Sequence, residues 1–299
     1  MKKKRLGWWW VAASVLVLAA SSPALASMQK SLDMAPGERL LVDADVGDVT
    51  VTAHDRSRAD VTIRSSRDLE DDFRVEVSRT DDGVRVELKK RRLGWSWSRV
   101  RHRVRIDVAV PTRTTVDVHT AGGGVELEGT VGDASLGTSG GDVAVARVRG
   151  DVRLRTSGGA IDARGIDGEL DAETSGGPID VDGVTGPLRA ETSGGRIDVS
   201  GAGDVVDAHT SGGGVSVRFT PGSSRGGNIS SSGGGIVVYV DPGVGLTVDA
   251  SSSGGPVRSD LPIATRGRTS RTDLRGELNG GGAPLRIRTS GGGISLRSL

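Results

Sequence analysis

The tetrapeptide Thr-Ser-Gly-Gly, repeated at a fixed interval, constrains the fold of this chain more than any other feature of its sequence. Copies begin at Thr138, Thr156, Thr174, Thr192 and Thr210, each 18 residues after the one before. A unit of 18 residues is too short to bury a hydrophobic core of its own, so such units become stable only by stacking on one another. The sequence therefore predicts one continuous array of stacked repeats.

The repeat becomes less regular towards both of its ends. A degenerate copy begins at Thr120, and later copies begin at Ser231, Ser252 and Thr289 with wider spacings. Of the 47 glycines, 42 lie at or beyond position 120, so the composition of the chain changes near Val118.

This change of composition, together with the signal sequence at the N-terminus that is described below, divides the chain into three predicted parts. Residues 1–26 form a signal peptide, and residues 27–118 form an N-terminal β cap with irregular coils. Residues 119–299 form a regular, glycine-rich solenoid, which makes one continuous domain with residues 40–118.

Apolar and polar residues alternate twice in every period, which is the pattern of a strand with one buried face. The first strand begins two residues after the Gly-Gly pair, and the second begins later in the period. Glycines such as Gly132 and Gly150 lie between the two, where the chain must turn. The first strand is marked by Val125, Val143, Ile161, Ile179, Ile197 and Val215, and the second by Ala134, Val152, Leu170, Leu188 and Val206.

These patterns predict an all-β fold, a parallel β-solenoid (β-helix) whose 18-residue coils contain two short strands each. Strands of successive coils would pair about 4.8 Å apart, and the two sheets would face each other across about 10 Å. Residues 40–118 alternate with irregular spacing, which indicates an irregular β cap, and residues 67–73 are expected to contain one helical turn. Residues 264–282 lack apolar alternation, so we expect an excursion there before a last coil at residues 284–296.

The threonine and serine of each turn are expected to be structural. Hydroxyl groups stacked at the same place in every coil can bond to the backbone of the turn. A catalytic serine would not recur in every coil without a histidine or an acid at a constant offset. The chain also lacks the phosphate-binding G-x-x-x-x-G-K-[ST] and zinc-binding H-E-x-x-H motifs, so we predict no enzyme, no catalytic residue and no cofactor.

The N-terminus has the features of a secretory signal. Basic residues occupy positions 2–5, an apolar run follows at residues 8–20, and Ala-Leu-Ala at residues 24–26 is an A-x-A cleavage site. The apolar run is shorter than the roughly 20 residues that cross a bilayer. We therefore expect cleavage after Ala26, with retention of the segment as an anchor as the alternative, and no transmembrane span after cleavage.

Composition and charge exclude further classes. Loss of the four basic residues changes the formal net charge from +1 to −3, so the exported protein has no overall attraction for nucleic acid. The absence of cysteine means that no disulfide stabilises it. We expect a periplasmic, cell-surface or extracellular location.

The column Asp162, Asp180 and Asp198 raises the question of calcium, because secreted β-rolls bind it with a nine-residue repeat, half of 18. In this chain Ile or Val replaces the second glycine of that motif, and neighbouring columns mix positive with negative residues. We interpret the charges as cross-coil pairs, with calcium binding as an alternative. His119 and His209 share a column but lie five coils apart, about 24 Å, so we predict no metal site.

Residues 89–105 (KKRRLGWSWSRVRHRVR), the basic segment, contain eight Lys or Arg and no Asp or Glu. Its two tryptophans are two positions apart and so lie on one side of an extended chain. Charge and stacking suit an anionic polysaccharide or a membrane surface. The alternative is a hairpin whose tryptophans cover the end of the core. The candidate ligand-binding residues are Lys89, Lys90, Arg91, Arg92, Trp95, Trp97, Arg99, Arg101 and Arg103.

The chain resembles a family of exported bacterial proteins that carry a “putative adhesin” domain of unassigned function. The resemblance rests on residues 104–111 (VRIDVAVP), the Gly122-Gly123 turn, the repeated T-S-G-G-x-I-D-V pattern and residues 285–294 (LRIRTSGGGI). It extends from about residue 40 to residue 299. It implies a β-solenoid displayed outside the cytoplasm and assigns no catalytic residues.

We therefore expect a non-enzymatic, adhesin-like β-solenoid that binds a cell-surface polysaccharide or an envelope protein. One alternative is a structural or signalling module of the envelope without polymer binding, and a second is a calcium-binding β-roll. No nucleic acid is expected as a partner. Unpaired strands in the end coils also predict end-to-end self-association.

Overall fold

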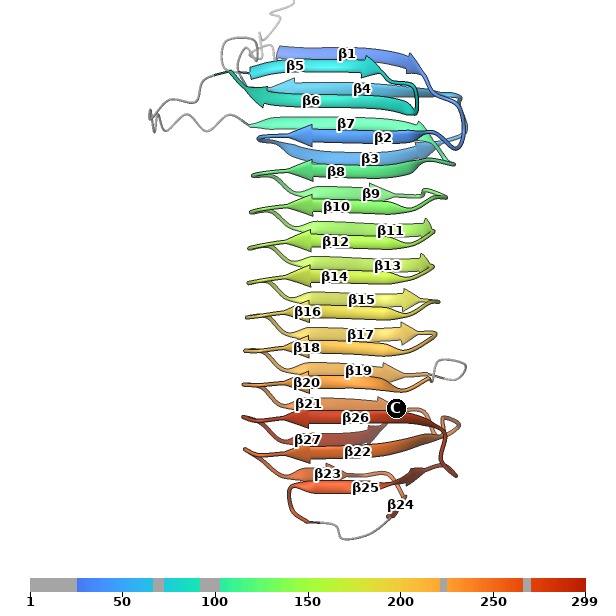
Figure 1. The fold of residues 1–299 in the computed structure, drawn as a ribbon, viewed down its shortest axis with the longest axis vertical. Coiled ribbons are helices and arrows are strands. Elements are labelled where there is room, and N and C mark those ends of the chain that lie inside the picture. The colour runs from blue at the N-terminus through green and yellow to red at the C-terminus, as the bar shows by residue number, and fades with distance from the viewer. Residues whose placement is uncertain (1–25, 67–72, 92–102, 221–224, 266–269) are drawn as a thin grey trace, which may run out of the picture.

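The computed structural model describes residues 26–66, 73–91, 103–220, 225–265 and 270–299, and these residues form strands and turns without a helix. The strands build two long sheets that lie face to face along an elongated molecule (Figure 1). We call the 13-stranded sheet A and the 14-stranded sheet B. The predicted signal peptide lies outside the described residues except for Ala26, and so does the predicted helical turn except for Phe73.

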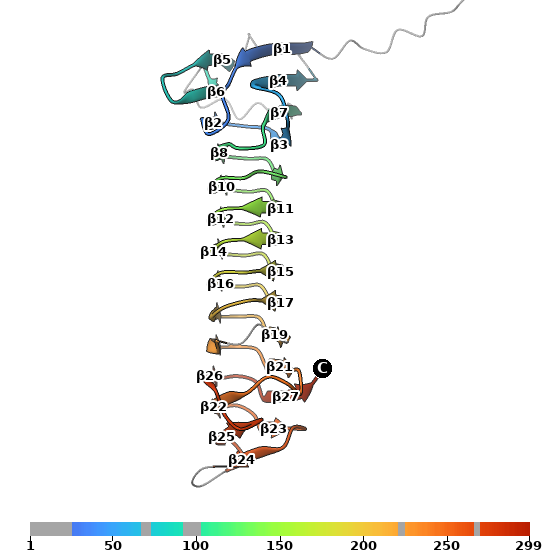
Figure 2. The same ribbon diagram turned by 90° about the vertical axis from the view of Figure 1, so that its right-hand side faces the viewer.

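Each central coil contributes one strand to each sheet, and the coils rise as a regular stack (Figure 2). The strands of sheet A are β9 (Val125–Glu128), β11 (Val143–Arg149), β13 (Ile161–Asp167), β15 (Ile179–Val184), β17 (Ile197–Ala202), β19 (Val215–Phe219) and β21 (Ile236–Val240). The strands of sheet B are β8 (Thr115–Thr120), β10 (Ala134–Thr138), β12 (Val152–Thr156), β14 (Leu170–Thr174), β16 (Leu188–Thr192), β18 (Val206–Thr210) and β20 (Gly227–Ser231).

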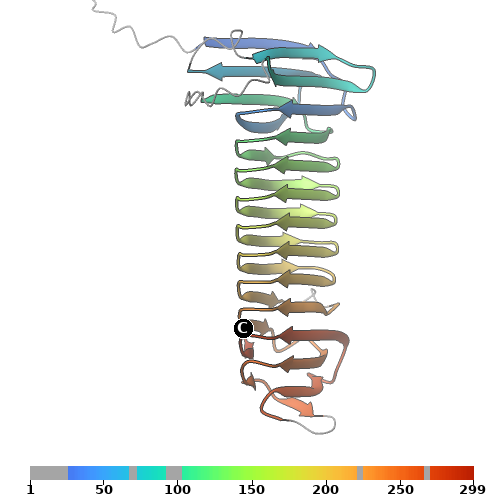
Figure 3. The ribbon, with the colours of Figure 1, turned by 60° about the vertical axis from the view of Figure 1, so that its left-hand side comes forward.

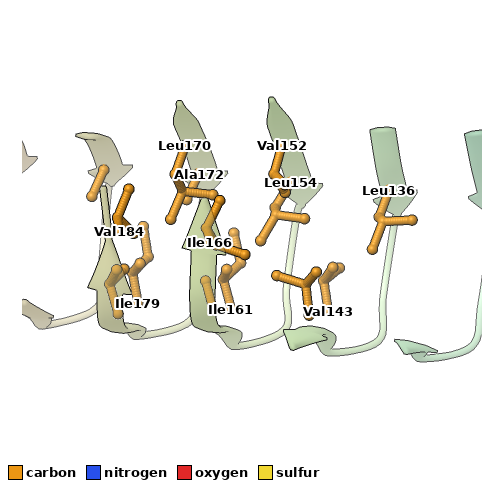
Figure 4. Packing of buried hydrophobic residues seen from close by; sticks show 14 of the residues in the cluster. Leu136, Val143, Val152, Leu154, Ile161, Ile166, Leu170, Ala172, Ile179 and Val184 are labelled. Atoms are coloured by element: carbon orange, nitrogen blue, oxygen red, sulfur yellow. The ribbon is translucent and has the colours of Figure 1, made fainter. Parts of the chain in front are cut away.

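Successive coils pair in parallel and in register, so equivalent positions of the repeat form straight columns. Val143 is paired with Ile161 in sheet A, and Leu136 is paired with Leu154 in sheet B. These side chains are buried, and the two rows point toward each other between the sheets (Figure 4). The predicted parallel β-solenoid with two strands per coil is confirmed.

A further buried column, which strict alternation did not predict, lies at the end of the sheet A strands. It contains Val148, Ile166, Val184 and Ala202, and Ile166 and Val184 reach the space between the sheets (Figure 4). The residue before each of them has a positive φ, as at Gly165 (63°). This local bend turns the next side chain inward after two outward residues, so the pattern of period two is broken there.

At the N-terminal end, the order of the strands in space differs from their order in the sequence. A first coil of β2 (Arg39–Ala44) and β3 (Asp48–His54) lies between β8 and β9 on one side and β6 (Gly83–Lys90) and β7 (Val104–Pro111) on the other. Antiparallel strands complete the cap: β1 (Ala26–Asp33) on β4 (Arg58–Ser65), β4 on β7, and β5 (Phe73–Arg79) on β6. The irregular β cap is therefore present, and it covers one side of the first coil, whose other side lies on the regular stack.

At the C-terminal end, the last coil in the sequence is not the last coil in space. β26 (Ala283–Thr289) and β27 (Ile294–Ser298) insert between β20 and β21 on one side and β22 (Leu246–Ser252) and β23 (Val257–Ser259) on the other. The expected excursion is present as β24 (Ile263–Thr265) and β25 (Asp273–Leu278), antiparallel to each other (Figure 3). The end of the chain is thus held inside the stack.

The strands at the two ends carry features that oppose edge-to-edge pairing. β23 and β24, the C-terminal edges, have three residues each. At the N-terminal edge, Lys30 of β1 donates a hydrogen bond from Nζ to the carbonyl oxygen of Val77 at 2.5 Å, which places a charge across the gap between the sheets. Short edges and inward charges are known to limit edge pairing. End-to-end self-association stays a prediction.

The carboxylate of Asp249 on β22 joins neighbouring strands of the C-terminal cap. Arg288 of the inserted strand β26 donates from Nη2 to this carboxylate at 2.8 Å, and Arg275 of β25 donates from Nε at 3.2 Å. The hydrogen bond from Arg288 is the main reason why the pKa of Asp249 lies below its ordinary value. One side chain thus links three neighbouring strands.

Two residues of the repeated turn control the approach of one coil to the next. A Cβ at the second glycine, as at Gly141 or Gly177, would lie closer than 3.0 Å to the backbone of the coil before it. The buried threonine of the turn links the same coils: Thr174 Oγ1 donates to the Gly159 carbonyl at 3.0 Å and accepts the Gly177 N–H at 3.3 Å. The structural role predicted for the threonine hydroxyl is confirmed, whereas that of the serine after it stays a prediction.

Gly141→Ala is expected to destabilise the fold by about 3 kcal/mol, because the new methyl group overlaps backbone that cannot move without separating two coils. Gly140→Ala is the matched control, since no atom lies within 4 Å of an added Cβ there. Thermal melts followed by circular dichroism would compare the two. Equal melting temperatures would contradict the proposed contact.

Thr174→Val is expected to cost about 2 kcal/mol, since it leaves a buried carbonyl and a buried N–H without partners while keeping the shape of the side chain. Thr174→Ser keeps the hydroxyl and should stay close to wild type, as serine fills the same role at Ser231. Denaturant unfolding would measure both variants. A Ser variant as unstable as the Val variant would refute the role of the hydroxyl.

Asp249→Asn is expected to lower the melting temperature at neutral pH. Because the pKa of Asp249 is lowered by folding, its stabilising effect is present above the unfolded-state pKa and is lost as the pH falls through the folded-state pKa. The difference between variant and wild type should therefore shrink between about pH 5 and about pH 2. Asp260→Asn, at an exposed position of the same cap, is the control, and a difference that does not change with pH would exclude this linkage.

Candidate functional site

The basic segment is an insertion on the edge of the solenoid where the repeated turns lie. It leaves sheet B at the end of β6 and enters sheet A at the start of β7. The neighbouring coil is that of β2 and β3, in which Ala44 is paired with Leu88 and Asp48 with Arg105. It crosses from sheet B to sheet A with residues 45–47 alone, whereas the coil of β6 and β7 uses residues 89–104. The inserted residues therefore begin and end on this turn edge, beside the N-terminal cap.

Lys89, the first residue of the segment, is fixed by carboxylates. Its Nζ lies 2.6 Å from Asp43 Oδ2 and 3.5 Å from Asp45 Oδ1. The hydrogen bond to Asp43 is the main cause of the raised pKa of Lys89. Asp45 also accepts the backbone N–H of Lys90 at 2.8 Å. These contacts hold the end of β6 and position the start of the segment.

The other described candidate residues are exposed cations. Lys90, Arg91 and Arg103 are exposed, and none of them forms an ion pair with a carboxylate of the described residues. The backbone N–H groups of Lys90 and Arg103 donate to side chains, to Asp45 at 2.8 Å and to Ser66 Oγ at 3.4 Å respectively. The remaining candidates lie outside the described residues: Arg92, Trp95, Trp97, Arg99 and Arg101.

The arginines between residues 125 and 210, in contrast, are paired with carboxylates. On sheet B, Asp171 lies between Arg153 at 3.4 Å and Arg189 at 3.7 Å. On sheet A, Arg196 lies 2.8 Å from Asp180 and 2.7 Å from Asp198. The predicted cross-coil charge pairs are confirmed.

The same pairs use the carboxylates that suggested calcium. Asp162 accepts a hydrogen bond from Arg164 at 2.5 Å, and Arg196 bridges the other two aspartates of the column. Nowhere in the described parts of the chain do three or more His, Cys, Asp or Glu side chains gather closely enough to hold a metal ion. His119 and His209 lie on β8 and β18, five strands apart in sheet B.

Open grooves follow the solenoid axis, and none of them was predicted from the sequence. One, of about 820 Å³, runs along the bend of the sheet A strands over Gly165, Gly183 and Gly201. A second, of about 290 Å³, runs along the start of the sheet B strands and is lined by five acidic residues and two arginines. A third, of about 190 Å³, crosses the outward aspartates of β13, β15 and β17 and reaches Arg218. Asp133 and Asp151 in this second groove each accept the backbone N–H of the equivalent residue in the next coil, at 2.9 and 3.0 Å. Their carboxylates thus already have a structural role.

Comparisons with known proteins agree with this architecture. A model of the Toastrack DUF4097 family matches residues 38–297. The chain is similar to a “putative adhesin” of known structure from Bacteroides fragilis, at 10% identity over 92% of this chain and 98% of that chain, with a TM-score of 0.45. It is also similar to a “putative cell adhesion protein” from Clostridium sporogenes, at 12% identity over 92% and 100% of the two chains, with a TM-score of 0.23.

No curated protein matches the chain. The described residues contain no helix that is long and apolar enough to cross a membrane.

Proposed function

We propose that this chain, which belongs to the Toastrack DUF4097 family, is a non-enzymatic, adhesin-like protein of the cell envelope or cell surface. It binds an anionic polymer of the envelope through the basic segment. The proposal includes an exported location, in keeping with the signal peptide that the sequence predicts at residues 1–26 and with the names of the similar proteins from Bacteroides fragilis and Clostridium sporogenes.

The observation that carries this proposal is the contrast between paired and unpaired cations. The arginines between residues 125 and 210 are engaged by carboxylates of the same or neighbouring coils, as around Asp171. Lys90, Arg91 and Arg103 are exposed without such a partner among the described residues. Unpaired cations that are exposed close together raise the local positive potential and attract polyanions.

Contacts at the start of the basic segment hold the end of β6 in place next to these cations. Lys89 is held by Asp43 and Asp45, so β6 ends in a fixed position before the free cations begin. Trp95 and Trp97 would add stacking contacts with sugar rings, as the sequence predicts. Attraction through exposed charges weakens as salt is added.

The triple variant Lys90→Gln, Arg91→Gln, Arg103→Gln is expected to bind a carbohydrate-rich envelope fraction at least about tenfold more weakly than wild type at low salt, since three charge contacts are removed. The matched control, Arg113→Gln, Arg271→Gln, Arg286→Gln, removes the same charge elsewhere on the surface. Pull-downs at increasing salt would compare the three proteins, with a thermal melt of each to verify folding.

A control variant as weak as the first variant would show that net charge alone decides binding, which would contradict the assigned site. Capture of one defined protein, equal for all three and insensitive to salt, would favour the structural or signalling alternative and overturn the polymer-binding function.

A further inference from the structure

The outward face of sheet A changes its charge along the solenoid axis. The central strands β13, β15 and β17 carry several aspartates, whereas β19, β21, β27 and β23, which lie side by side at the C-terminal end (Figure 1), carry no Asp or Glu. These four strands contain three arginines. One end of this face is therefore basic.

Three side chains of this basic end stand in a column. Arg218 of β19 is paired in register with Tyr239 of β21, and Tyr239 is paired with Arg297 of β27. We call Arg218, Tyr239 and Arg297 the arginine–tyrosine column. Since adjacent strands lie about 4.8 Å apart, the two arginines are roughly 10 Å from each other along the axis, with the ring between them.

The tyrosine ring orients one guanidinium without neutralising it. The Arg218 Cζ lies 5.1 Å from the centre of the Tyr239 ring, a cation–π contact. A guanidinium stacked in this way keeps the N–H groups of its edge for other acceptors. Neither Arg218 nor Arg297 forms an ion pair with a carboxylate of the described residues.

Acids around this column do not neutralise it. Asp182 accepts a hydrogen bond from Ser200 at 2.8 Å, and Asp198 is paired with Arg196 at 2.7 Å. Asp260 follows β23 next to Arg297, since its backbone N–H donates to the Leu296 carbonyl at 3.0 Å, but no ion pair joins the side chains of Asp260 and Arg297. The guanidinium N–H groups of the column are therefore left for a ligand from outside the chain.

We infer that the arginine–tyrosine column is a binding site for the carboxylate or phosphate groups of an anionic polysaccharide or related linear polyanion. The site is separate from the basic segment and does not depend on the function proposed for it. Guanidinium edges match the two oxygens of such groups in a bidentate arrangement. A linear polymer that crosses β19, β21 and β27 would meet both arginines in turn.

The shape and charge of the face favour a linear polymer over a membrane. A planar anionic membrane on this face would also cover the aspartates of β15 and β17, which repel it. A polymer chain that crosses only the C-terminal strands avoids them. The neighbouring outward column contains Ser216, Val237 and Ser295, of which Val237 alone is apolar, so the patch offers little apolar surface for insertion into a bilayer.

The test measures binding of the full chain to polygalacturonate, which carries carboxylates, and to inorganic polyphosphate, with neutral dextran as the negative probe. Arg218→Gln and Arg297→Gln are each expected to weaken binding by about tenfold, the effect of one charge-assisted hydrogen bond. Arg286→Gln, which removes an exposed charge from the opposite sheet, should have no such effect. The probe that responds identifies the anionic group.

Two substitutions of Tyr239 distinguish the effect of its ring, which orients the Arg218 guanidinium, from the effect of net charge. Tyr239→Phe keeps the ring and should retain the affinity, whereas Tyr239→Leu keeps the net charge but removes the cation–π contact and should lose several-fold. Thermal melts of all variants verify folding. Equal losses for Arg218→Gln and Arg286→Gln, or wild-type affinity for Tyr239→Leu, would overturn the site.

The two proposals fail independently. If the triple variant of the basic segment loses all polyanion binding while Arg218→Gln binds like wild type, the site on sheet A is refuted and the proposed function stands. If Arg218→Gln weakens binding of the purified polymers while the triple variant still binds the envelope fraction, the proposed function of the basic segment is refuted and the site on sheet A stands. Arg218-dependent binding to phosphatidylglycerol vesicles, without binding to either polymer, would overturn the polymer as ligand.

Discussion

The close approach of backbone to backbone at the second glycine of each turn is the contact on which the rest of this structure depends. Any side chain there would push one coil away from the next, as the contacts of an added Cβ at Gly141, Gly159 and Gly177 show. The buried threonine then joins the same two coils through its hydroxyl. With the turns held this closely, the strands meet in register and their apolar columns form a continuous core without disulfides.

A core built from repeated apolar columns offers no site inside the molecule that could recognise one particular ligand. Specificity can only come from outward residues, and from places where the chain departs from the repeat. In the central coils the outward charges largely neutralise one another, as around Asp171 and Arg196. Cations without an ion pair among the described residues lie towards the two ends, and they include those of the basic segment and of the arginine–tyrosine column. The central coils separate these two regions.

Much of the fold could be predicted from the sequence, but much less of the candidate site. The strand columns, the structural threonine and the alternation of charge across coils all repeat, and a repeat of fixed period sets which residues become neighbours. Arg218, Tyr239 and Arg297 each lie eight residues after the start of a copy of the repeat, at Thr210, Ser231 and Thr289, so the repeat places them in one column. It does not make Tyr239 and Arg297 neighbours, because the copy at Ser252 comes between theirs in the sequence, whereas β27 is inserted next to β21 in the structure.

The sequence by itself determined that the chain is a parallel β-solenoid, because an 18-residue unit with two apolar alternations and an obligatory glycine turn can be buried only against copies of itself. The tertiary structure alone decided how the stack ends. The first coil at β2 and β3, and the last coil at β26 and β27, are both held between other strands, and antiparallel strands close both ends. The physical reason is that local alternation defines a strand and its buried face, whereas the choice of neighbour depends on hydrogen bonds and packing between segments far apart in the chain.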